Sequence, residues 1–407
     1  MLSTPKAERI TLVVYGLRNS GKSYLTNNLL RTEASIVSDR PGTTTDPVVH
    51  AMEMGPLGPV SVVDTAGFDD DEDQLGSMRV ERSSKKLDVA DLVLFVTRSD
   101  TPPTDGEVSL AEKLRERGVP CLVVLTFADS GLCDEKRHFA PAFRKISVDN
   151  HTGQGLEDLD MALQGFSAHI EREITPLEGL VQPGETVLLV TPIDASAPKA
   201  RMILPQVETI RDILDKDCTM AISTEKRLSQ CYSGLKERPS LVITDSQAFS
   251  EVGAILPKDQ LLTSFSIVFA RKKGDLAFFV EGLTRLSEVP SGGKILVLEA
   301  CKHHRMNDDI GTVKIPNIFR KKVRSDVTFE LKQDMPSKEE LKSYHLVINC
   351  AGCMVTRNDM MNRIETLREA GVPGTNYGLF LAWGKGLLPR ALEPFPVEHA
   401  LYRGFSC

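Results

Sequence analysis

The chain has 407 residues, which at roughly 150 residues per domain corresponds to two or three domains. Hydrophobic residues make up 41% of the sequence, so a largely disordered protein is excluded. With 49 Lys and Arg against 56 Asp and Glu, the net charge of −7 gives no bulk attraction to nucleic acids or anionic membranes. The sequence has neither an apolar run long enough to span a bilayer nor the apolar segment of a signal peptide. We therefore expect a cytoplasmic protein that binds no membrane and no nucleic acid.

Short apolar runs alternate with amphipathic stretches from residue 9 to about residue 165. We predict strands at residues 10–15, 60–64, 91–97, 121–126 and 145–147. We predict helices between them at residues 22–31, 75–87, 105–117 and 156–166. This alternation is typical of an α/β domain with a mostly parallel sheet covered on both faces.

A second series of elements follows residues 175–185, a segment with two Pro and two Gly that we interpret as a linker. The strands predicted in this series are residues 186–192, 241–244, 264–270, 294–300 and 345–349. The predicted helices are residues 200–215, 246–255 and 275–286. We assign three α/β domains, at residues 1–170, 176–265 and 266–407, while the sequence leaves open whether the last two form a single domain.

A phosphate-binding loop follows the first predicted strand. Residues 16–23 read Gly-Leu-Arg-Asn-Ser-Gly-Lys-Ser, which fits the pattern G-x-x-x-x-G-K-[ST] between a strand and a helix. We expect Lys22 to reach the β- and γ-phosphates and Ser23 to bind Mg²⁺. The predicted nucleotide-binding residues of this loop are Gly16, Asn19, Ser20, Gly21, Lys22 and Ser23.

Two further segments suit the same site. Asp64-Thr-Ala-Gly67 ends a predicted strand, where the carboxylate can bind the Mg²⁺ shell and the N–H of Gly67 can contact the γ-phosphate. The Thr-rich residues 41–46 (PGTTTD) can offer the hydroxyl of Thr44 to the same Mg²⁺. We predict Lys22, Asp64 and Gly67 as the catalytic residues.

These motifs, in this order, resemble the GTPase family that includes TrmE and Era. Residues 78–84 and 89–93 resemble the switch II helix and the next strand of that family. In its potassium-dependent members, an Asn at the position of Asn19 helps to coordinate K⁺, although Asn is also an ordinary turn residue. Phe68 stands where Ras-like enzymes place a water-orienting Gln, so K⁺ is expected to compensate for it. The resemblance implies Mg²⁺-dependent, K⁺-stimulated GTP hydrolysis.

The resemblance is incomplete at the base-binding site. Where the family has N-K-x-D, residues 126–129 read Thr-Phe-Ala-Asp. Asp129 keeps the carboxylate that can accept hydrogen bonds from guanine, and Phe127 could stack on the purine where the Lys stem normally lies. Ser147 is predicted in the last base-contacting loop, which can equally be an ordinary exit from a strand.

Cysteines mark a second candidate site. Cys350 and Cys353 form a C-x-x-C motif directly after a predicted strand, and Cys301-Lys-His303-His304 follows another. In a parallel sheet the carboxyl ends of strands converge on one crevice. Three thiolates with an incomplete fourth position suit a [4Fe–4S] cluster with an exchangeable iron site. Zinc bound by three Cys and one His is the chemical rival, and a redox dithiol or metal-free thiols remain open.

The cysteine pattern resembles that of the [FeFe]-hydrogenase maturation GTPases, the HydF family, over essentially the whole chain. In this pattern Cys301-x-His303 precedes the C-x-x-C motif, with 46 residues (304–349) between them. The resemblance implies a homodimer with a dimerisation domain at residues 176–265 and a cluster-binding domain at residues 266–407. It also implies a scaffold that receives a diiron precursor made with two radical-SAM maturases and delivers it to apo [FeFe]-hydrogenase. The predicted strands 187–190 and 241–244 could offer a sheet edge for the dimer.

One position departs from the family pattern. Many members carry His immediately before C-x-x-C, whereas this chain has Asn349, a poor iron ligand. We expect His303 as the fourth ligand, with His304, Asp308 or solvent as alternatives. The second function considered is an RNA-related GTPase, but the basic run at residues 320–324 is too short for a nucleic-acid module.

Overall fold

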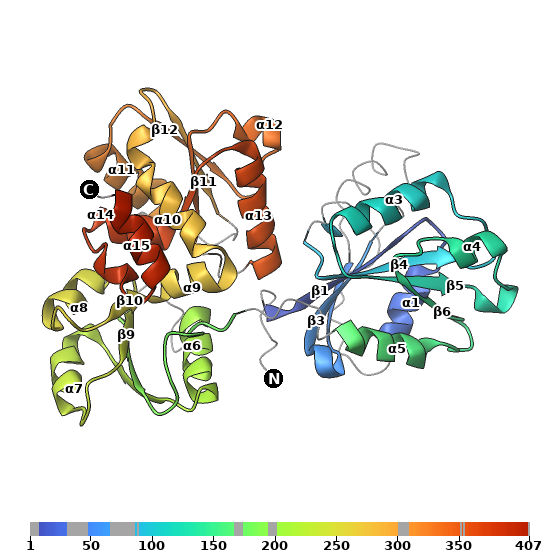
Figure 1. Cartoon of the computed structure of the whole chain (residues 1–407), viewed down its shortest axis with the longest axis horizontal. Coiled ribbons are helices and arrows are strands. Elements are labelled where there is room, and N and C mark those ends of the chain that lie inside the picture. The colour runs from blue at the N-terminus through green and yellow to red at the C-terminus, as the bar shows by residue number, and fades with distance from the viewer. Residues whose placement is uncertain are drawn as a thin grey trace. The chain divides into compact units, whose positions relative to one another are not determined.

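The computed structural model describes residues 8–30, 48–65, 86–87, 89–166, 174–193, 202–299, 309–350, 352 and 355–405. The chain divides into two compact units, Met1–Arg172 and Glu173–Cys407 (Figure 1). In the described part of the chain, no helix has the length and apolar character needed to cross a membrane.

The first unit contains a six-stranded sheet in the order β2-β3-β1-β4-β5-β6. Its strands are β1 (Ile10–Gly16), β2 (Val48–Glu53), β3 (Pro59–Asp64), β4 (Leu92–Arg98), β5 (Cys121–Thr126) and β6 (Arg144–Ser147). Its helices are α1 (Lys22–Leu29), α3 (Asp105–Glu116), α4 (Asp134–His138) and α5 (Leu156–Gly165), with 3₁₀ turns η2 (Gly55–Leu57) and η3 (Ala128–Ser130). All strand pairs are parallel except β2–β3, and separate hydrophobic clusters cover the two faces. The five predicted strands are confirmed, and β2 is an antiparallel edge strand that the sequence pattern did not predict.

The second unit contains two four-stranded parallel sheets, in the orders β10-β9-β7-β8 and β12-β11-β13-β14. The first comprises β7 (Thr186–Val190), β8 (Thr219–Ser223), β9 (Leu241–Thr244) and β10 (Leu262–Ser264), and the second β11 (Lys294–Leu298), β12 (Thr328–Lys332), β13 (Leu346–Asn349) and β14 (Gly374–Asn376). Each sheet, numbered along its own segment, therefore has the same strand order, 2-1-3-4. The structure reveals a repeated topology.

The helices of the second unit follow the same repeated plan. Those of the first half are η5 (Glu225–Arg227), α6 (Leu204–Asp215), α7 (Leu228–Gly234), α8 (Phe249–Ile255), α9 (Phe265–Lys273), α10 (Leu276–Thr284) and η6 (Leu286–Glu288). Those of the second half are the π-helical turn η7 (Ile310–Lys314), α11 (Ile315–Lys322), α12 (Lys338–Leu341), α13 (Arg357–Ala370), α14 (Tyr377–Gly384), η8 (Arg390–Leu392) and α15 (Pro396–Phe405). In both halves a helix follows the fourth strand at once.

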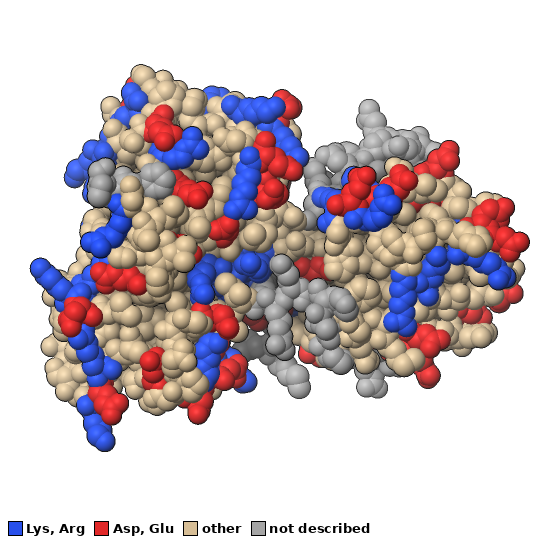
Figure 2. Space-filling view, in the orientation of Figure 1, with Lys and Arg blue, Asp and Glu red and all other residues tan. Residues whose placement is uncertain are grey.

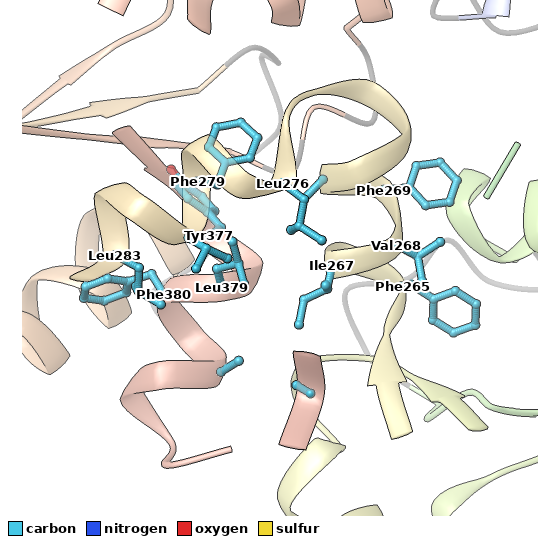
Figure 3. Packing of buried hydrophobic residues seen from close by; sticks show 14 of the residues in the cluster. Phe265, Ile267, Val268, Phe269, Leu276, Phe279, Leu283, Tyr377, Leu379 and Phe380 are labelled. Atoms are coloured by element: carbon cyan, nitrogen blue, oxygen red, sulfur yellow. The ribbon is translucent and has the colours of Figure 1, made fainter. Parts of the chain in front are cut away.

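The two halves exchange the elements that follow these helices. α10 from the first half packs against β14 of the second, while η8 from the second half packs against β10 of the first. The hydroxyl of Thr263 in β10 donates to the carbonyl oxygen of Ala391 in η8 at 3.0 Å. Side chains of α9, α10 and α14 therefore lie in one continuous hydrophobic core, as Figure 3 shows for Phe265, Phe279 and Phe380.

Two expectations about the strands of the second unit are wrong. Residues 264–270 were expected to form a strand, but α9 begins at Phe265, with the Ser264 hydroxyl capping the N–H of Ile267 at 3.4 Å. A run of apolar residues that is buried all round does not reveal by its period whether it is helix or strand. Strands β7 and β9, expected to offer a sheet edge, are the two central strands, because β8 and β10 flank them.

Residues 175–185 form a packed segment rather than a free linker. Leu177 and Val181 are buried in the core of the second unit, and the N–H of Leu177 donates to Asp212 Oδ2 at 2.7 Å. The Pro and Gly residues produce turns here, but these turns lie on a hydrophobic core. The predicted helix at residues 75–87 lies outside the described residues except at its end.

Candidate functional site

The phosphate loop connects β1 to α1. The buried Lys22 donates from Nζ to the carbonyl oxygens of Gly16 at 3.1 Å and Leu17 at 2.6 Å. Asn19 and Gly21 have left-handed backbone conformations, with φ of 59° and 87°. The loop therefore surrounds the Lys22 side chain. This conformation is typical of loops whose backbone N–H groups and lysine bind phosphates.

Ser23 and Asp64 lie together beside this lysine. Burial raises the pKa of Asp64 above its usual value, while a hydrogen bond with Ser23 and the charge of Lys22 act in the opposite direction. Asp64 Oδ1 is buried and has no hydrogen-bond partner among the described residues. A hydroxyl and a carboxylate oxygen with spare capacity fit the ligand preferences of Mg²⁺. The other residues predicted near this position lie outside the described residues: Thr44, Gly67 and Phe68.

The loop after β5 is tied to the phosphate loop. Thr126, which occupies the Asn position of the family's base-recognition motif, donates from Oγ1 to the carbonyl oxygen of Ser20 at 2.7 Å. Asp129 lies exposed in η3, and Ser147 is the exposed last residue of β6. The hydrogen bond of Thr126 thus joins the loop that contains Asp129 to the phosphate loop.

Asn150 is a second connecting residue that the sequence reasoning missed. Its Nδ2 donates to the carbonyl oxygen of Gly21 at 3.3 Å, and Asn28 Nδ2 donates to the carbonyl oxygen of Asn150 at 3.0 Å. Short polar side chains at the end of β5 and in the loop after β6 were the available signal for both connecting residues. Such side chains commonly bond to nearby backbone groups in loops.

The second site lies at the carboxyl ends of β11 and β13, the central strands of their sheet. The chain continues from β11 to β12 on one side and from β13 to β14 on the other, so the strand order reverses between them. Open α/β sheets bind ligands at such a reversal. Cys350 follows β13 directly, is half-buried, and donates its N–H to the carbonyl oxygen of Leu298 at 2.8 Å.

The remaining predicted ligands of this site lie outside the described residues: Cys301, His303, His304, Asp308 and Cys353. Within the part of the chain that the structure describes, no group of three or more His, Cys, Asp or Glu side chains is arranged to hold a metal ion. Of the predicted ligands, Cys350 is the one that the structure describes.

Glu299 and Tyr377 lie close to Cys350. Glu299 follows β11, is only 3% exposed, and accepts from the hydroxyl of Tyr377 at 3.5 Å. Burial, reinforced by the nearby Glu299, Cys350 and Asp309, raises the pKa of Tyr377 above its usual value. A buried carboxylate and a protonated phenol therefore lie beside the one predicted cysteine ligand that is described.

Asn349, the last residue of β13, is a buried polar residue beside Cys350. Its side chain is 1% exposed, and neither its Nδ2 nor its Oδ1 has a hydrogen-bond partner among the described residues. Leaving a buried polar group without a partner costs about 1–3 kcal/mol, so such groups occur mainly where something else completes the site. The residues present therefore fit a bound group next to Cys350.

Three family models match successive parts of the chain. The 50S ribosome-binding GTPase model matches residues 11–127. The hydrogen maturase F dimerization domain matches residues 177–274, and the hydrogen maturase F tetramerization domain matches residues 277–394. The chain is a HydF-type protein. It consists of an N-terminal P-loop GTPase domain followed by dimerisation and tetramerisation domains.

Relatives of the HydF-type chain match its GTPase domain. The tRNA modification GTPase MnmE of Methylobacterium radiotolerans is 36% identical over 157 residues, covering 39% of this chain and 33% of that protein. MnmE of Aquifex aeolicus is 33% identical over 168 residues, covering 41% and 37%. The chain thus spans about a third of the length of these relatives. The GTPase model and these relatives support GTP binding with Mg²⁺ and GTP hydrolysis by this domain.

Two solved structures are also similar. A variant of Aquifex aeolicus Era bound to GDP and AlF₄⁻ has 18% identity and a TM-score of 0.32, covering 60% of this chain and 97% of that one. The G domain of the T. maritima FeoB iron transporter has 21% identity and a TM-score of 0.29, covering 39% and 99%.

Proposed function

We propose that this HydF-type protein is a GTP-hydrolysing scaffold that carries a [4Fe–4S] cluster and delivers a diiron precursor to apo [FeFe]-hydrogenase. The observation that supports this most is the buried Asn349 beside Cys350, whose side chain has no hydrogen-bond partner among the described residues. It lies at the strand-order reversal of a chain with HydF domains. The precursor, made with two radical-SAM maturases, is cargo in this proposal. We expect the protein to act in the cytoplasm.

The proposed GTPase chemistry uses residues of the phosphate loop and β3. Lys22 would leave the carbonyl oxygens of Gly16 and Leu17 and donate to the β- and γ-phosphates. Ser23 and Asp64, together with Thr44, would hold Mg²⁺, which neutralises charge on the same phosphates. We assign K⁺ coordination to Asn19, and the N–H of Gly67 to the γ-phosphate.

The proposed cluster would be held by Cys301, Cys350 and Cys353, leaving one iron for an exchangeable ligand. His303 is the expected fourth ligand. Glu299 is a further candidate, because its carboxylate is buried two residues before Cys301. Imidazole and carboxylate differ in how they bind iron, so EPR of the Glu299→Gln and His303→Ala variants distinguishes the two.

We infer that the dimer forms along β8 and α6. β8 is an edge strand of its sheet, and Ile222 on it is 47% exposed. α6 buries the polar Thr209 and Asp212 but leaves Val207 and Leu214 48% and 56% exposed. A helix that exposes apolar side chains beside an edge strand fits a surface that a second copy covers.

Reconstitution with iron and sulfide under anaerobic conditions tests the cluster. We expect the single variants Cys301→Ser, Cys350→Ser and Cys353→Ser to lose most of the iron and the EPR signal, because hydroxyl oxygen replaces thiolate poorly. Cys133→Ser, a cysteine of the GTPase domain, is the matched control and should keep both. A Cys350→Ser protein with a full iron complement and normal hydrogenase activation would overturn the assignment.

GTP hydrolysis is measured on the same proteins. All four cysteine variants should hydrolyse GTP normally, whereas Lys22→Ala should lose activity and Lys113→Ala, an exposed lysine of α3, should not. Hydrolysis should be faster in K⁺ than in Na⁺, and equal rates would remove the role of Asn19.

An RNA-related role is the alternative function. On the face shown in Figure 2, however, Lys and Arg are interspersed with Asp and Glu. Salt-dependent RNA binding would favour it.

A further inference from the structure

Arg98 and Phe127 form a stacked pair at the base-binding loop. The guanidinium carbon of Arg98 lies 4.0 Å from the centroid of the Phe127 ring. Arg98 is the last residue of β4, and it is paired in the sheet with Thr126, the last residue of β5. The pair therefore lies where β4 and β5 end. Thr126 and Phe127 occupy the positions at which the family has Asn and Lys.

The backbone at Phe127 adopts a conformation that bulky residues rarely take. Its φ is 56°, in the left-handed region. The hydroxyl of Ser99 holds the turn by bonding to the carbonyl oxygens of Phe127 at 2.9 Å and Gly131 at 2.7 Å. Strain that the surroundings maintain in this way is concentrated at ligand sites.

Asp100 fixes the position of Arg98. Arg98 donates from Nε to Oδ1 at 2.9 Å and from Nη2 to Oδ2 at 2.6 Å. This two-point contact constrains the planar guanidinium. Phe127 itself is only half-buried, so its ring is covered by Arg98 on one side without being enclosed.

The stacked pair adjoins the phosphate loop. Thr126 Oγ1 bonds to the carbonyl oxygen of Ser20 at 2.7 Å, and a Cβ on Gly21 would lie 3.4 Å from Thr126 Cγ2. A nucleotide with its phosphates on this loop is thus expected to place its base near the residues that follow Thr126. Asp129, two residues beyond Phe127, is exposed and can accept hydrogen bonds.

We propose that the Arg98–Phe127 pair is the platform on which the purine base stacks. Phe127 would contact the base, and Arg98 would act through Phe127 as a positioning residue by holding the ring with a cation–π contact. Stacking tolerates any base, so the pair sets affinity while Asp129 sets the preference for guanine. This inference rests on the proposed GTP binding and adds the residues that replace the missing Asn and Lys.

Calorimetric titration of the full chain with GDP and with tripolyphosphate, both with Mg²⁺, separates base contacts from phosphate contacts. We expect Phe127→Leu to bind GDP about 10- to 100-fold more weakly and tripolyphosphate unchanged, because only stacking is lost. Phe127→Tyr should keep the wild-type affinity for GDP. Arg98→Met should weaken GDP binding, and adding it to Phe127→Leu should cause no further loss. Arg115→Met, an exposed arginine of α3, is the matched control.

The outcomes separate this inference from the proposed function. Wild-type protein that binds GDP, together with a Phe127→Leu variant of unchanged affinity, overturns the platform and leaves GTP binding intact. Wild-type protein that does not bind GDP overturns both. If Phe127→Leu also loses binding of tripolyphosphate, the Phe127→Tyr and Arg98→Met variants test the proposal in its place. An Arg98→Met variant with wild-type affinity for GDP overturns the role of Arg98.

Discussion

Gly282 of α10 lies directly against the backbone of Gly374 in β14, so that a Cβ on Gly282 would be 2.0 Å from the carbonyl oxygen of Gly374. The helix comes from the first half of the second unit and the strand from the second half. A close contact of this kind requires glycine, since any side chain would push the helix away from the strand. The exchange of elements between the halves therefore depends on the absence of one methyl group.

Gly282→Ala should destabilise the second unit by about 1–3 kcal/mol through overpacking, although Ala is the better helix former. The free energy of unfolding in urea measures the effect. Gly253→Ala in α8 is the control, because its Cβ would meet its nearest atom, Arg390 Nη1, at an ordinary 3.5 Å. Equal stability of the Gly282→Ala variant and the wild-type protein would show that α10 can move off β14 without cost.

Asp64→Asn should stabilise the nucleotide-free protein while weakening Mg²⁺-dependent nucleotide binding. Burial raises the pKa of Asp64, so the folded state disfavours the charged form. The wild-type protein therefore loses stability as the pH rises from the unfolded pKa through the higher folded pKa, and the variant should not. Thermal unfolding with and without Mg²⁺ and GDP, from pH 4 upward, measures both effects. A stability difference that shrinks with rising pH would contradict the assignment.

Ile222→Lys should weaken the dimer by at least about tenfold, because a lysine on β8 would be buried in the interface. Molar mass by light scattering over a dilution series measures this effect. The control is Met161→Lys in α5, where the wild-type side chain is 60% exposed in the GTPase domain. A chain lacking residues 1–170 should remain dimeric, and a monomer would argue against dimerisation through the second unit.

Asn349→Leu should leave the cluster-free protein as stable as the wild type or more stable by about 1–3 kcal/mol, because it removes an unsatisfied buried amide. The reconstituted cluster should show a changed reduction potential in an EPR-monitored titration, since a polar neighbour is lost. Thr244→Val is the matched control at the end of β9. The Thr244 hydroxyl donates to the carbonyl oxygen of Val190 at 3.0 Å. The variant loses this hydrogen bond and should therefore be destabilised. An unaltered potential in Asn349→Leu would place the amide away from the cluster.

Local patterns in the sequence determined the phosphate loop and most of the strands. The glycine spacing around Lys22 is set by one turn between one strand and one helix, so neighbouring residues contain all of the information. Strands β4 and β5 are likewise visible as short apolar runs, because both are buried along their length. The placement of Cys350 after a strand also followed from its immediate neighbours.

Tertiary structure alone decided the features that depend on distant residues. Whether residues 265–273 form a helix or a strand depends on their burial on all sides, and the edge position of β8 depends on the strand order of the sheet. Neither burial nor strand order is a local property of the sequence. The contacts Arg98–Phe127 and Gly282–Gly374 join segments that are far apart in the sequence. The lack of a hydrogen-bond partner for the Asn349 side chain among the described residues likewise appears only in the folded chain. Sequence period reports which face of one element is apolar, whereas packing decides which element covers that face.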